Sequence, residues 1–249
     1  MTIDGKKIAG EIVANLAPKF RALGPLTLGI VMNQGDPASQ SFVRIKERVA
    51  GRLNVELKRF SPAEFEDALA CDGTIVQLPI LNGDELLARL GPEKDVDALG
   101  PAPLVRAPVA EAVSEILTRA NVSALGKKAV VVGAGKLVGQ PCAELLRELG
   151  AHVTVVTLEE GSLDSLRDAD IVVSGAGSPG LITPTMLKEG VILIDAGTSE
   201  SGGKIVGDAL LECAEVASIF TPVPGGVGPI AVAMLYKNLF TLSKMARGQ

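Results

Sequence analysis

Residues 128–141 constrain the possible fold more than any other part of this sequence. Four apolar residues in a row, 129–132, are typical of a buried strand in a parallel sheet, and glycines follow at the spacing Gly133-x-Gly135-x-x-x-Gly139. Glycine allows a sharp turn from strand to helix, and the unpaired N–H groups at a helix start bind phosphate. Two interpretations remain open at this point: a nucleotide-binding turn, or a tight turn that binds nothing.

A second strand after this turn favours the nucleotide-binding interpretation. Residues 152–156 form an apolar segment about one helix length further on, which completes a strand–helix–strand unit. Two later strands, 170–174 and 191–195, also run into turns of small residues. Because the turns after parallel strands gather at one edge of the sheet, this half of the chain predicts a Rossmann-type dinucleotide-binding lobe.

The first half of the sequence predicts another α/β lobe. The apolar pattern indicates helices over 8–20, 39–53, 61–70 and 109–121 and strands over 26–32, 54–60 and 73–79. With 249 residues, 47% of them hydrophobic, the chain has enough core for one large or two small domains. We therefore expect an α/β protein with two lobes, of which the second is the Rossmann-type domain.

Composition excludes several classes of partner. A net charge of -5 and 3% aromatic residues provide neither a basic surface nor stacking platforms, so we expect no nucleic acid partner. The absence of a long apolar run and of a signal-peptide core predicts a cytoplasmic protein without a membrane partner. Cys71, Cys142 and Cys213 are far apart, and His152 is the only histidine. This pattern predicts reduced core thiols, a surface histidine and no metal site.

Lys46 stands out because it interrupts an apolar helix face. Phe42, Lys46, Val49 and Leu53 follow one another at three- and four-residue spacing, which places them on one side of the helix. In one interpretation the lysine stem is buried along the core and the ammonium reaches water. In the other, the amine is desolvated and its pKa is lowered, so that it can exchange protons near neutral pH.

Three further segments carry a signal. Gln77 is a polar amide at the end of a buried strand, where α/β sheets place their ligands, although buried amides also serve to satisfy neighbouring backbone groups. The charged segment 92–97 is expected to be a solvated loop. Residues 221–229 are too rich in proline and glycine for a helix or strand and indicate a rigid loop that permits close approach, followed by a final helix to about residue 245.

Seven short motifs are distributed along nearly the whole chain. They are Asp4-Gly5-Lys6-Lys7-Ile8-Ala9, Gly35-Asp36-Pro37-Ala38-Ser39 leading to Lys46, Val76-Gln77-Leu78-Pro79, Lys94-Asp95-Val96-Asp97, Gly133-x-Gly135-x-x-Val138-Gly139-x-Pro141, Gly207-Asp208 and Thr221-Pro222-Val223-Pro224-Gly225-Gly226-Val227-Gly228-Pro229. Together they resemble the bifunctional methylene-tetrahydrofolate dehydrogenase/cyclohydrolase family, and the last motif, a nine-residue string, is the most specific.

The resemblance implies a domain organisation and an assembly. Residues 1–119 plus 228–249 would form a folate-binding catalytic domain, and residues 120–227 would form the dinucleotide-binding domain. A cleft would lie between the two lobes, with the last helix returning to the N-terminal lobe, and the protein would be a homodimer.

The resemblance also implies roles for individual residues. Lys46 matches the catalytic lysine of the family, Gln77 matches its partner, and Asp97 matches the carboxylate that holds the pterin, all three counted as catalytic. A carboxylate suits this last role because it can accept parallel hydrogen bonds from the amino group and ring N–H of a pterin. The other substrate-binding positions are Phe42, Leu78, Pro224, Gly225 and Gly226.

The cofactor-binding positions follow from the same resemblance. They are Gly133, Ala134, Gly135, Lys136, Val138, Gly139, Thr157, Glu159, Gly175, Ala176 and Thr198. The family default is NADP, but Leu158 stands where an arginine often contacts its extra phosphate, and Glu159 and Glu160 follow. Because an acidic side chain suits a ribose diol and repels a phosphate, these residues favour NAD.

The implied reaction has two steps with different demands. Oxidation of methylenetetrahydrofolate to methenyltetrahydrofolate needs alignment of the folate and nicotinamide rings, without proton transfer. Hydrolysis to formyltetrahydrofolate needs a base, which a neutral Lys46 would provide while Gln77 orients the amine or the water.

The chain departs from the family pattern at several positions. Phe42 replaces a tyrosine, Val109-Ala110-Glu111-Ala112 replaces Thr-Pro-x-Gly, Ala231 replaces a threonine, and Gly135 replaces a serine. Without the tyrosine hydroxyl, we expect the hydrolase to suffer more than the dehydrogenase. Two alternatives stay open: a degraded paralogue that binds folate or nucleotide for regulation, or a dehydrogenase for another small substrate on the same two lobes.

Overall fold

A computed structural model describes residues 1–33, 37–159, 162–201 and 204–248. The chain divides into two compact units, each an α/β structure as predicted. The Lys46 unit comprises Ala9–Pro108 and Val232–Gln249, and the Gly133 unit comprises Met1–Ile8 and Val109–Ala231. The expected domain boundaries at 119/120 and 227/228, and the expected cleft, stay predictions.

The Lys46 unit is built on a parallel three-stranded sheet. The strands β1 (Leu26–Val31), β2 (Val55–Phe60) and β3 (Gly73–Val76) follow the spatial order β2-β1-β3. Its helices are α1 (Gly5–Leu23), α2 (Pro37–Leu53), α3 (Phe65–Ala68), α4 (Gly83–Arg89) and α7 (Val227–Ala246), with a 3₁₀ turn at Pro62–Glu64; α1 and α7 each begin in the Gly133 unit. Parallel sheets are stable when both faces are covered, and β1 is accordingly almost fully buried.

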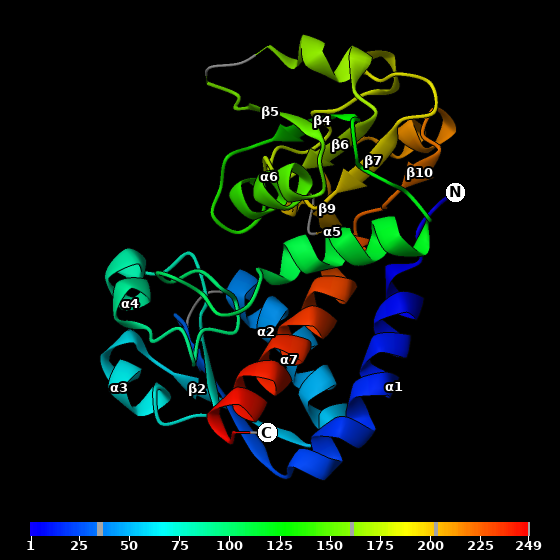
Figure 1. The fold of residues 1–249 in the computed structure, drawn as a ribbon. Helices are drawn as coiled ribbons and strands as arrows, with labels where there is room; N and C mark the ends of the chain where they lie inside the picture. The colour runs from blue at the N-terminus through cyan, green and yellow to red at the C-terminus, as the bar shows by residue number, and fades with distance from the viewer. Residues whose placement is uncertain (34–36, 160–161, 202–203, 249) are drawn as a thin grey trace. The chain divides into compact units, whose positions relative to one another are not determined.

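The core of this unit joins its sheet to three helices. Phe20 of α1, Ile30 of β1, Val43 of α2 and Leu239 of α7 belong to one buried cluster. Figure 1 shows α7, coloured orange to red, as the last helix before the C-terminus. The helix is expected from the sequence, and its apolar face docks on the sheet formed by the first half of the chain.

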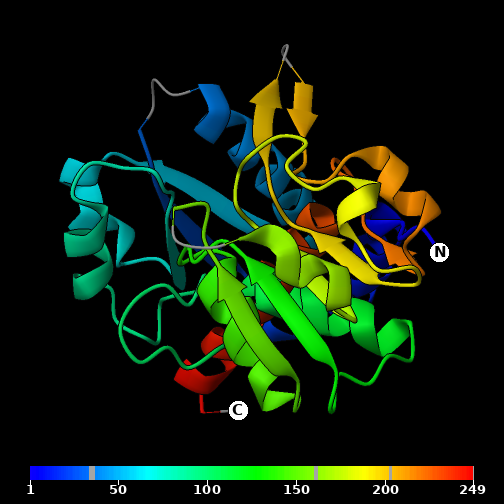
Figure 2. The ribbon, with the colours of Figure 1, turned by 90° about the horizontal axis from the view of Figure 1, so that it is seen from above.

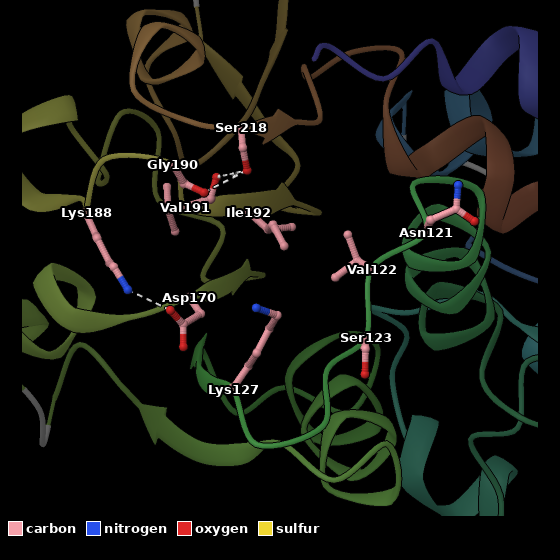
Figure 3. Close-up of a pocket in the computed structure, with 10 residues that line it drawn as sticks. All are labelled: Asn121, Val122, Ser123, Lys127, Asp170, Lys188, Gly190, Val191, Ile192 and Ser218. Atoms are coloured by element: carbon pink, nitrogen blue, oxygen red, sulfur yellow. Dashed lines mark hydrogen bonds and ion pairs between the residues drawn. The ribbon is translucent and has the colours of Figure 1, made fainter.

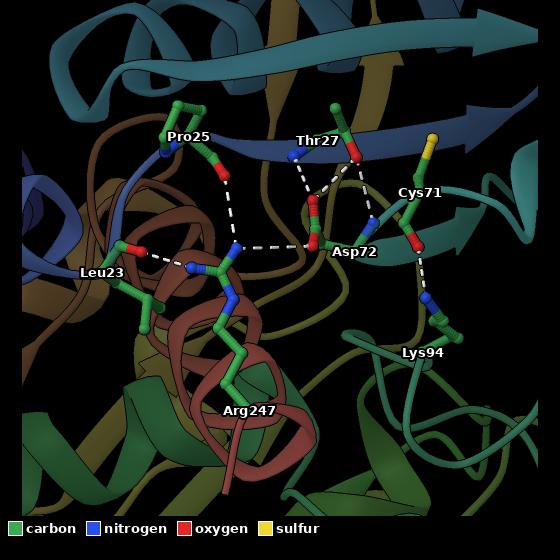
Figure 4. Close-up of polar contacts among 7 residues, drawn as sticks. All are labelled: Leu23, Pro25, Thr27, Cys71, Asp72, Lys94 and Arg247. Atoms are coloured by element: carbon green, nitrogen blue, oxygen red, sulfur yellow. Dashed lines mark hydrogen bonds and ion pairs between the residues drawn. The ribbon is translucent and has the colours of Figure 1, made fainter. Parts of the chain in front are cut away.

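A polar cluster fixes the entrance to β1 and the chain end after α7 (Figure 4). The Asp72 carboxylate accepts hydrogen bonds from the Thr27 N–H at 2.7 Å and the Thr27 hydroxyl at 2.8 Å. The guanidinium of Arg247 donates to the carbonyls of Leu23 and Pro25 and lies 3.9 Å from the Asp72 carboxylate. The C-terminal segment is therefore anchored to the start of the sheet by charge-assisted hydrogen bonds.

The expectation that segment 92–97 is solvated is wrong. Thr74 of β3 donates its N–H to the Lys94 carbonyl at 2.7 Å and pairs with Asp95 in a parallel bridge. The Lys94 ammonium donates to the Cys71 carbonyl at 2.6 Å (Figure 4), and Asp95 is only 1% exposed. The segment extends the sheet beside β3, and its backbone hydrogen bonds hold it against the core.

The ends of two other predicted elements also differ. The strand predicted over 73–79 ends at Val76, and the Leu78–Pro79 peptide bond that follows is cis. A proline lacks the N–H that would continue a ladder, so the chain leaves the sheet here. The helix expected from Ser61 to Ala70 is split into the 3₁₀ turn and the short α3.

The Gly133 unit contains a parallel five-stranded sheet. Its strands β4 (Lys128–Val132), β5 (His152–Val156), β6 (Ile171–Ser174), β7 (Ile192–Asp195) and β10 (Ile219–Phe220) have the order β10-β7-β6-β4-β5. The helices are α5 (Pro108–Arg119) and α6 (Gly139–Glu148), with 3₁₀ segments at Leu163–Asp168, Pro184–Met186 and Leu211–Glu215. The antiparallel pair β8 (Ser199–Ser201) and β9 (Lys204–Val206) stands apart from this sheet (Figure 2).

The strand order places a switch point beside β4. The chain runs from β4 to β5 on one side and then to β6 on the other, so the direction of winding reverses between β4 and β6. In doubly wound sheets, ligands bind outside the carboxyl ends of the strands at such a point. The Rossmann-type topology predicted for this half of the chain is confirmed.

His152 is exposed at the start of β5, and the three cysteines are buried and free, as predicted. No helix in the described parts of the chain combines the length and apolar character needed to cross a bilayer.

Candidate functional site

The amine of Lys46 is buried against the amide of Gln77. Lys46 Nζ donates a hydrogen bond of 2.6 Å to Gln77 Oε1, and the lysine is only 9% exposed. Burial disfavours the charged form and lowers the pKa of Lys46, while the negative charge of Asp97 opposes this shift. Of the two interpretations of this lysine, the structure matches the desolvated amine.

Two elements separated in the sequence bring this pair together. Lys46 lies on α2, and Gln77 directly follows β3, where its N–H donates to the Val31 carbonyl at the end of β1. Gln77 Nε2 donates to the Leu78 carbonyl at 3.2 Å, which orients the amide so that its oxygen faces Lys46. The Gln77 side chain therefore has both expected roles: its nitrogen satisfies a neighbouring backbone carbonyl, and its oxygen contacts the lysine.

Asp97 contributes a carboxylate to the electrostatics of Lys46. It is half-buried in the segment beside β3. Burial raises the pKa of Asp97, and the positive charge of Lys46 acts in the opposite direction. The two groups thus each favour the charged form of the other, against a common desolvation cost.

Sequence reasoning missed one residue beside Lys46. The Tyr236 hydroxyl, on α7, donates a 2.7 Å hydrogen bond to the Lys46 backbone carbonyl. Tyr236 is fully buried, and it is the only tyrosine in the chain. Nothing in the local pattern of the final helix distinguishes this position, because the partner lies 190 residues away.

Two of the predicted substrate-binding positions lie close to this pair in the sequence. Leu78 is half-buried, and its carbonyl accepts the hydrogen bond from Gln77 Nε2. Phe42 lies on α2, but its side chain is outside the described residues, so its expected role stays a prediction.

The predicted cofactor turn after β4 is closely packed. Gly133 has a φ of 98°, and a Cβ there would lie 2.8 Å from the Gly175 carbonyl oxygen. A Cβ at Gly139 would lie 2.1 Å from the Gly133 carbonyl oxygen, so both positions require glycine. By contrast, a Cβ at Gly135 would meet nothing within 4 Å. The turn leaves open space at Gly135, directly before α6.

This geometry fits a nicotinamide dinucleotide. Residues 134–137 are exposed, Val138 is half-buried, and α6 begins at Gly139. A helix of this length has a positive N-terminal end and unpaired N–H groups, to which a pyrophosphate binds. The exposed turn includes Lys136, which adds a positive side chain near the helix start.

The other predicted cofactor residues follow neighbouring strands at the same sheet edge. Thr157 and Glu159 follow β5, Gly175 and Ala176 follow β6, and Thr198 follows β7. Because all the strands are parallel, their carboxyl ends meet at one edge. Glu159 and Thr198 are exposed there, as is Leu158, whereas Glu160 lies outside the described residues.

Two buried aspartates lie beneath this edge, and neither was predicted as a site residue. Asp195 ends β7 and accepts hydrogen bonds from the N–H groups of Gly197 and Ala209, both at 2.9 Å. Burial is the main cause that raises the pKa of Asp195 to about 6. Asp208 accepts from Ser174 and from two N–H groups of the turn after β6. For Asp195 the available signal was a charged residue directly after a run of four apolar residues, and for Asp208 it was the family motif Gly207-Asp208.

The loop after β10 explains the first motif of the chain. Gly5 donates its N–H to the Gly225 carbonyl at 2.9 Å, and a Cβ at Gly5 would lie 1.8 Å from the Gly226 carbonyl oxygen. Gly225 has a φ of 110°, and the peptide bond before Pro224 is cis. The predicted substrate positions Pro224, Gly225 and Gly226 thus lie in a tightly packed loop of the Gly133 unit, as the composition indicated.

A cavity of about 350 Å³ lies at the opposite edge of this sheet (Figure 3). It opens at the amino ends of β4, β6 and β7, where the Lys188 ammonium contacts the Asp170 carboxylate at 2.7 Å. None of the predicted site residues lines it. Its lining is formed by Asn121, Val122, Ser123, Lys127, Asp170, Lys188, Gly190, Val191, Ile192 and Ser218.

Comparisons with known proteins agree over the whole chain. Residues 107–247 match the family model described as tetrahydrofolate dehydrogenase/cyclohydrolase, NAD(P)-binding domain. The bifunctional protein FolD of Staphylococcus aureus (strain Newman) is 33% identical over 278 residues, covering 99% of this chain and 97% of the relative.

Solved structures give the same result. The bifunctional FolD methylenetetrahydrofolate dehydrogenase/cyclohydrolase of Campylobacter jejuni has a TM-score of 0.90 and 29% identity, with 99% of each chain covered. The Trypanosoma brucei enzyme of this name, solved with NADP cofactor and inhibitor, has a TM-score of 0.90 and 32% identity, covering 100% of this chain and 99% of that one.

Proposed function

The chain belongs to the tetrahydrofolate dehydrogenase/cyclohydrolase family, and on that premise we propose its reaction. It oxidises methylenetetrahydrofolate to methenyltetrahydrofolate with a nicotinamide cofactor, and it hydrolyses the product to formyltetrahydrofolate. The observation that carries this proposal is the buried 2.6 Å hydrogen bond between Lys46 and Gln77. A desolvated amine of this kind has no evident structural need, and it suits the hydrolytic step.

The oxidative step needs positioning more than acid–base chemistry. The lone pair of the nitrogen next to the methylene bridge is donated to the methylene carbon as hydride leaves. The protein therefore has to hold the pterin in one orientation. Asp97 would accept the pterin amino group and ring N–H in parallel hydrogen bonds. A bound nicotinamide supplies the hydride acceptor. Residues 133–139 would hold the pyrophosphate of the dinucleotide. Gly175, Ala176 and Thr198 would line the same carboxyl edge of the sheet.

The hydrolytic step needs a base, and the Lys46 amine has the required environment. Water adds to the methenyl carbon, and one of its two protons passes to Nζ. A carbon–nitrogen bond of the ring then breaks as the remaining hydroxyl proton is transferred to the departing nitrogen, which gives the formyl group and a ring N–H. Burial favours the neutral amine that this step requires. Gln77 accepts one N–H of the amine, which fixes the nitrogen while leaving its lone pair available for the water proton.

The residues after β5 bear on the choice between the two nicotinamide cofactors. Leu158 and Glu159 are both exposed directly after this strand, where the adenosine ribose of a dinucleotide lies in Rossmann-type domains. A carboxylate there binds a ribose diol and repels the 2′-phosphate of NADP. We therefore infer that the chain uses NAD in preference to NADP, although both fit the turn.

One assay tests the function. Purified protein is mixed with methylenetetrahydrofolate and either NAD or NADP, and the absorbance of methenyl product and reduced cofactor is followed. Hydrolysis of methenyltetrahydrofolate is measured separately without nucleotide. We expect turnover in both assays. Absence of turnover with both nucleotides would overturn the dehydrogenase proposal.

The same assay separates the two alternatives. A degraded paralogue would bind folate, as detected by calorimetry, without any chemistry, and a dehydrogenase for another substrate would not bind folate. The close Lys46–Gln77 contact argues against degradation. Preservation of the folate-family motifs through segment 94–97 argues against a different substrate.

The assembly is the one that the family resemblance implies, and the location is the one expected from the sequence. We infer a cytoplasmic homodimer, and analytical ultracentrifugation should then give twice the mass of the chain. A monomer at micromolar concentration would contradict the inferred dimer without affecting the proposed chemistry.

A further inference from the structure

We propose that Asp208 is a positioning residue whose carboxylate sets the shape of the cofactor-binding turn after β6. This inference rests on the proposed function, because it assumes that Gly175 and Ala176 contact the nicotinamide cofactor. Asp208 itself is fully buried and would touch neither the cofactor nor the folate. It would act through the backbone that it holds.

Three hydrogen bonds converge on this carboxylate. Asp208 Oδ2 accepts from the Ser174 hydroxyl at 2.6 Å and from the Ala176 N–H at 2.8 Å, and Oδ1 accepts from the Ser178 N–H at 2.8 Å. The two N–H groups belong to the turn that follows β6, and Ser174 is the last residue of that strand. The turn is therefore wrapped around an acceptor supplied by a segment about 30 residues further along the chain.

The surrounding backbone leaves the carboxylate no other position. A Cβ at Gly197 would lie 2.2 Å from Asp208 Cγ, and a Cβ at Gly207 would lie 2.1 Å from Asp195 Oδ2. Each aspartate thus packs directly against a glycine of the other segment. This reciprocal contact requires glycine at both positions and fixes Asp208 below the turn.

The turn after β6 in turn supports the glycine turn after β4. A Cβ at Gly133 would lie 2.8 Å from the Gly175 carbonyl oxygen, and a Cβ at Gly175 would lie 2.4 Å from the Val138 side chain. The two turns are in direct contact at the switch point of the sheet, so a displacement of one has to move the other. Asp208 therefore influences both walls of the proposed cofactor site.

The chemistry of the carboxylate is specific. Its two oxygens accept all three hydrogen bonds, and an asparagine of the same shape would direct its NH₂ group at one or two of these three donors. A buried N–H left without an acceptor is costly, so the turn would move to find another partner. Replacement of the charge alone should therefore alter the turn while the strands stay in place.

The test compares Asp208→Asn with the exposed control Asp168→Asn in the same unit. Binding of NADH and NADPH is measured directly by fluorescence, and hydrolysis of methenyltetrahydrofolate, which needs no nucleotide, is measured in parallel. We expect D208N to weaken binding of the preferred nucleotide by about tenfold or more. The KM for cofactor should rise accordingly, with hydrolysis unchanged, and D168N should match the wild type.

Ser174→Ala provides a second, milder variant in case D208N folds poorly. It removes one donor and leaves the turn amides on the carboxylate, so nucleotide affinity should fall by about threefold with hydrolysis and thermal unfolding little changed. Wild-type nucleotide affinity in both variants would overturn the inference. So would an equal loss of binding and hydrolysis in both, since that result indicates a general structural role.

The outcomes also separate this inference from the proposed function. Because nucleotide binding is read directly, the effect of D208N remains measurable even if the wild type shows no turnover with folate. In that case the proposed reaction fails and the positioning role stands. Failure of the wild-type protein to bind either nucleotide would overturn the positioning role itself.

Discussion

The Tyr236 hydroxyl donates a 2.7 Å hydrogen bond to the backbone carbonyl of Lys46 and so connects α7 to α2. Both residues lie in the same unit, and Tyr236 is fully buried. The C-terminal helix therefore contributes directly to the placement of the proposed base. Burial also raises the pKa of Tyr236, so the hydroxyl stays protonated and remains a donor at physiological pH.

Replacement of this tyrosine by phenylalanine should weaken the site slightly without dismantling it. Y236F removes one buried hydrogen bond, and we expect a loss of about 1 kcal/mol in the free energy of unfolding, measured by urea denaturation. Hydrolysis of methenyltetrahydrofolate should fall by a few-fold, while NADH affinity stays unchanged. Equal stability and equal hydrolysis rates in Y236F and the wild type would show that this hydrogen bond contributes to neither.

Removal of the Lys46 amine should separate the two activities. Lys46→Met keeps an unbranched apolar stem and removes the nitrogen, so we expect the hydrolysis rate to fall by about 10²- to 10⁴-fold. The dehydrogenase should lose less, because hydride transfer requires no base. Stopped-flow measurement of both steps checks this, and Gln77→Glu serves as a companion that retains the position but adds a charge. Hydrolysis at the wild-type rate in K46M would exclude the amine as the base.

The pH dependence of hydrolysis should follow the same amine. Burial lowers the pKa of Lys46, and only the neutral form accepts a proton from water. The hydrolysis rate should therefore rise with pH and level off above a pKa that lies below the ordinary value for lysine. A rate that falls as pH rises, or one that levels off only at the ordinary pKa of lysine, would contradict this assignment.

Asp195 should make the protein less stable as pH rises through the mildly acidic range. Its folded-state pKa, about 6, is above that of an unfolded aspartate, so the folded state binds more protons between about 4 and 6. The associated stability is present at low pH and is lost as pH rises through this window, by about 2 to 3 kcal/mol.

The Asp195→Asn variant tests that assignment through the slope of the free energy of unfolding against pH. D195N cannot titrate, so its free energy of unfolding should lack this loss between pH 4 and 6, whatever its absolute stability. Urea unfolding at a series of pH values measures the difference from wild type. Parallel curves for the two proteins would mean that Asp195 does not titrate in this range.

The residues after β5 should decide between NAD and NADP. The wild type should show the higher kcat/KM with NAD, and Leu158→Arg should improve kcat/KM for NADP by about tenfold, because a guanidinium binds the 2′-phosphate. Leu158→Gln, which adds polarity without charge, is the matched control. A wild type that prefers NADP by a wide margin would contradict the inferred role of Glu159.

Much of the fold was predictable because its signals are local. The apolar run before Gly133 and the spacing of the following glycines predict β4, the turn and α6, and all three occur. The family resemblance likewise named Lys46 and Gln77 before their contact was visible. Steric preferences and hydrophobic periodicity act within one element, so both can be predicted from a single stretch of sequence.

Several other features depended on partners that are far away in the sequence. The charges of segment 92–97 predict a solvated loop, but in the structure the segment forms backbone hydrogen bonds with β3. Asp208 is part of a family motif, but only the structure shows that the turn after β6 donates hydrogen bonds to it. No local pattern shows where a buried polar group will find its partner, so the hydrogen bonds of these residues could not be predicted.

The sequence by itself determined the α/β class, the Rossmann-type turn and the lysine that breaks an apolar helix face. Only the tertiary structure decided that the Lys46 amine is buried against Gln77, that Tyr236 donates to the Lys46 carbonyl, and that Asp208 accepts hydrogen bonds from the turn after β6. The physical reason is that secondary structure follows from the conformational preferences of neighbouring residues. The energy of a buried polar group, in contrast, depends on donors and acceptors that folding brings from distant parts of the chain.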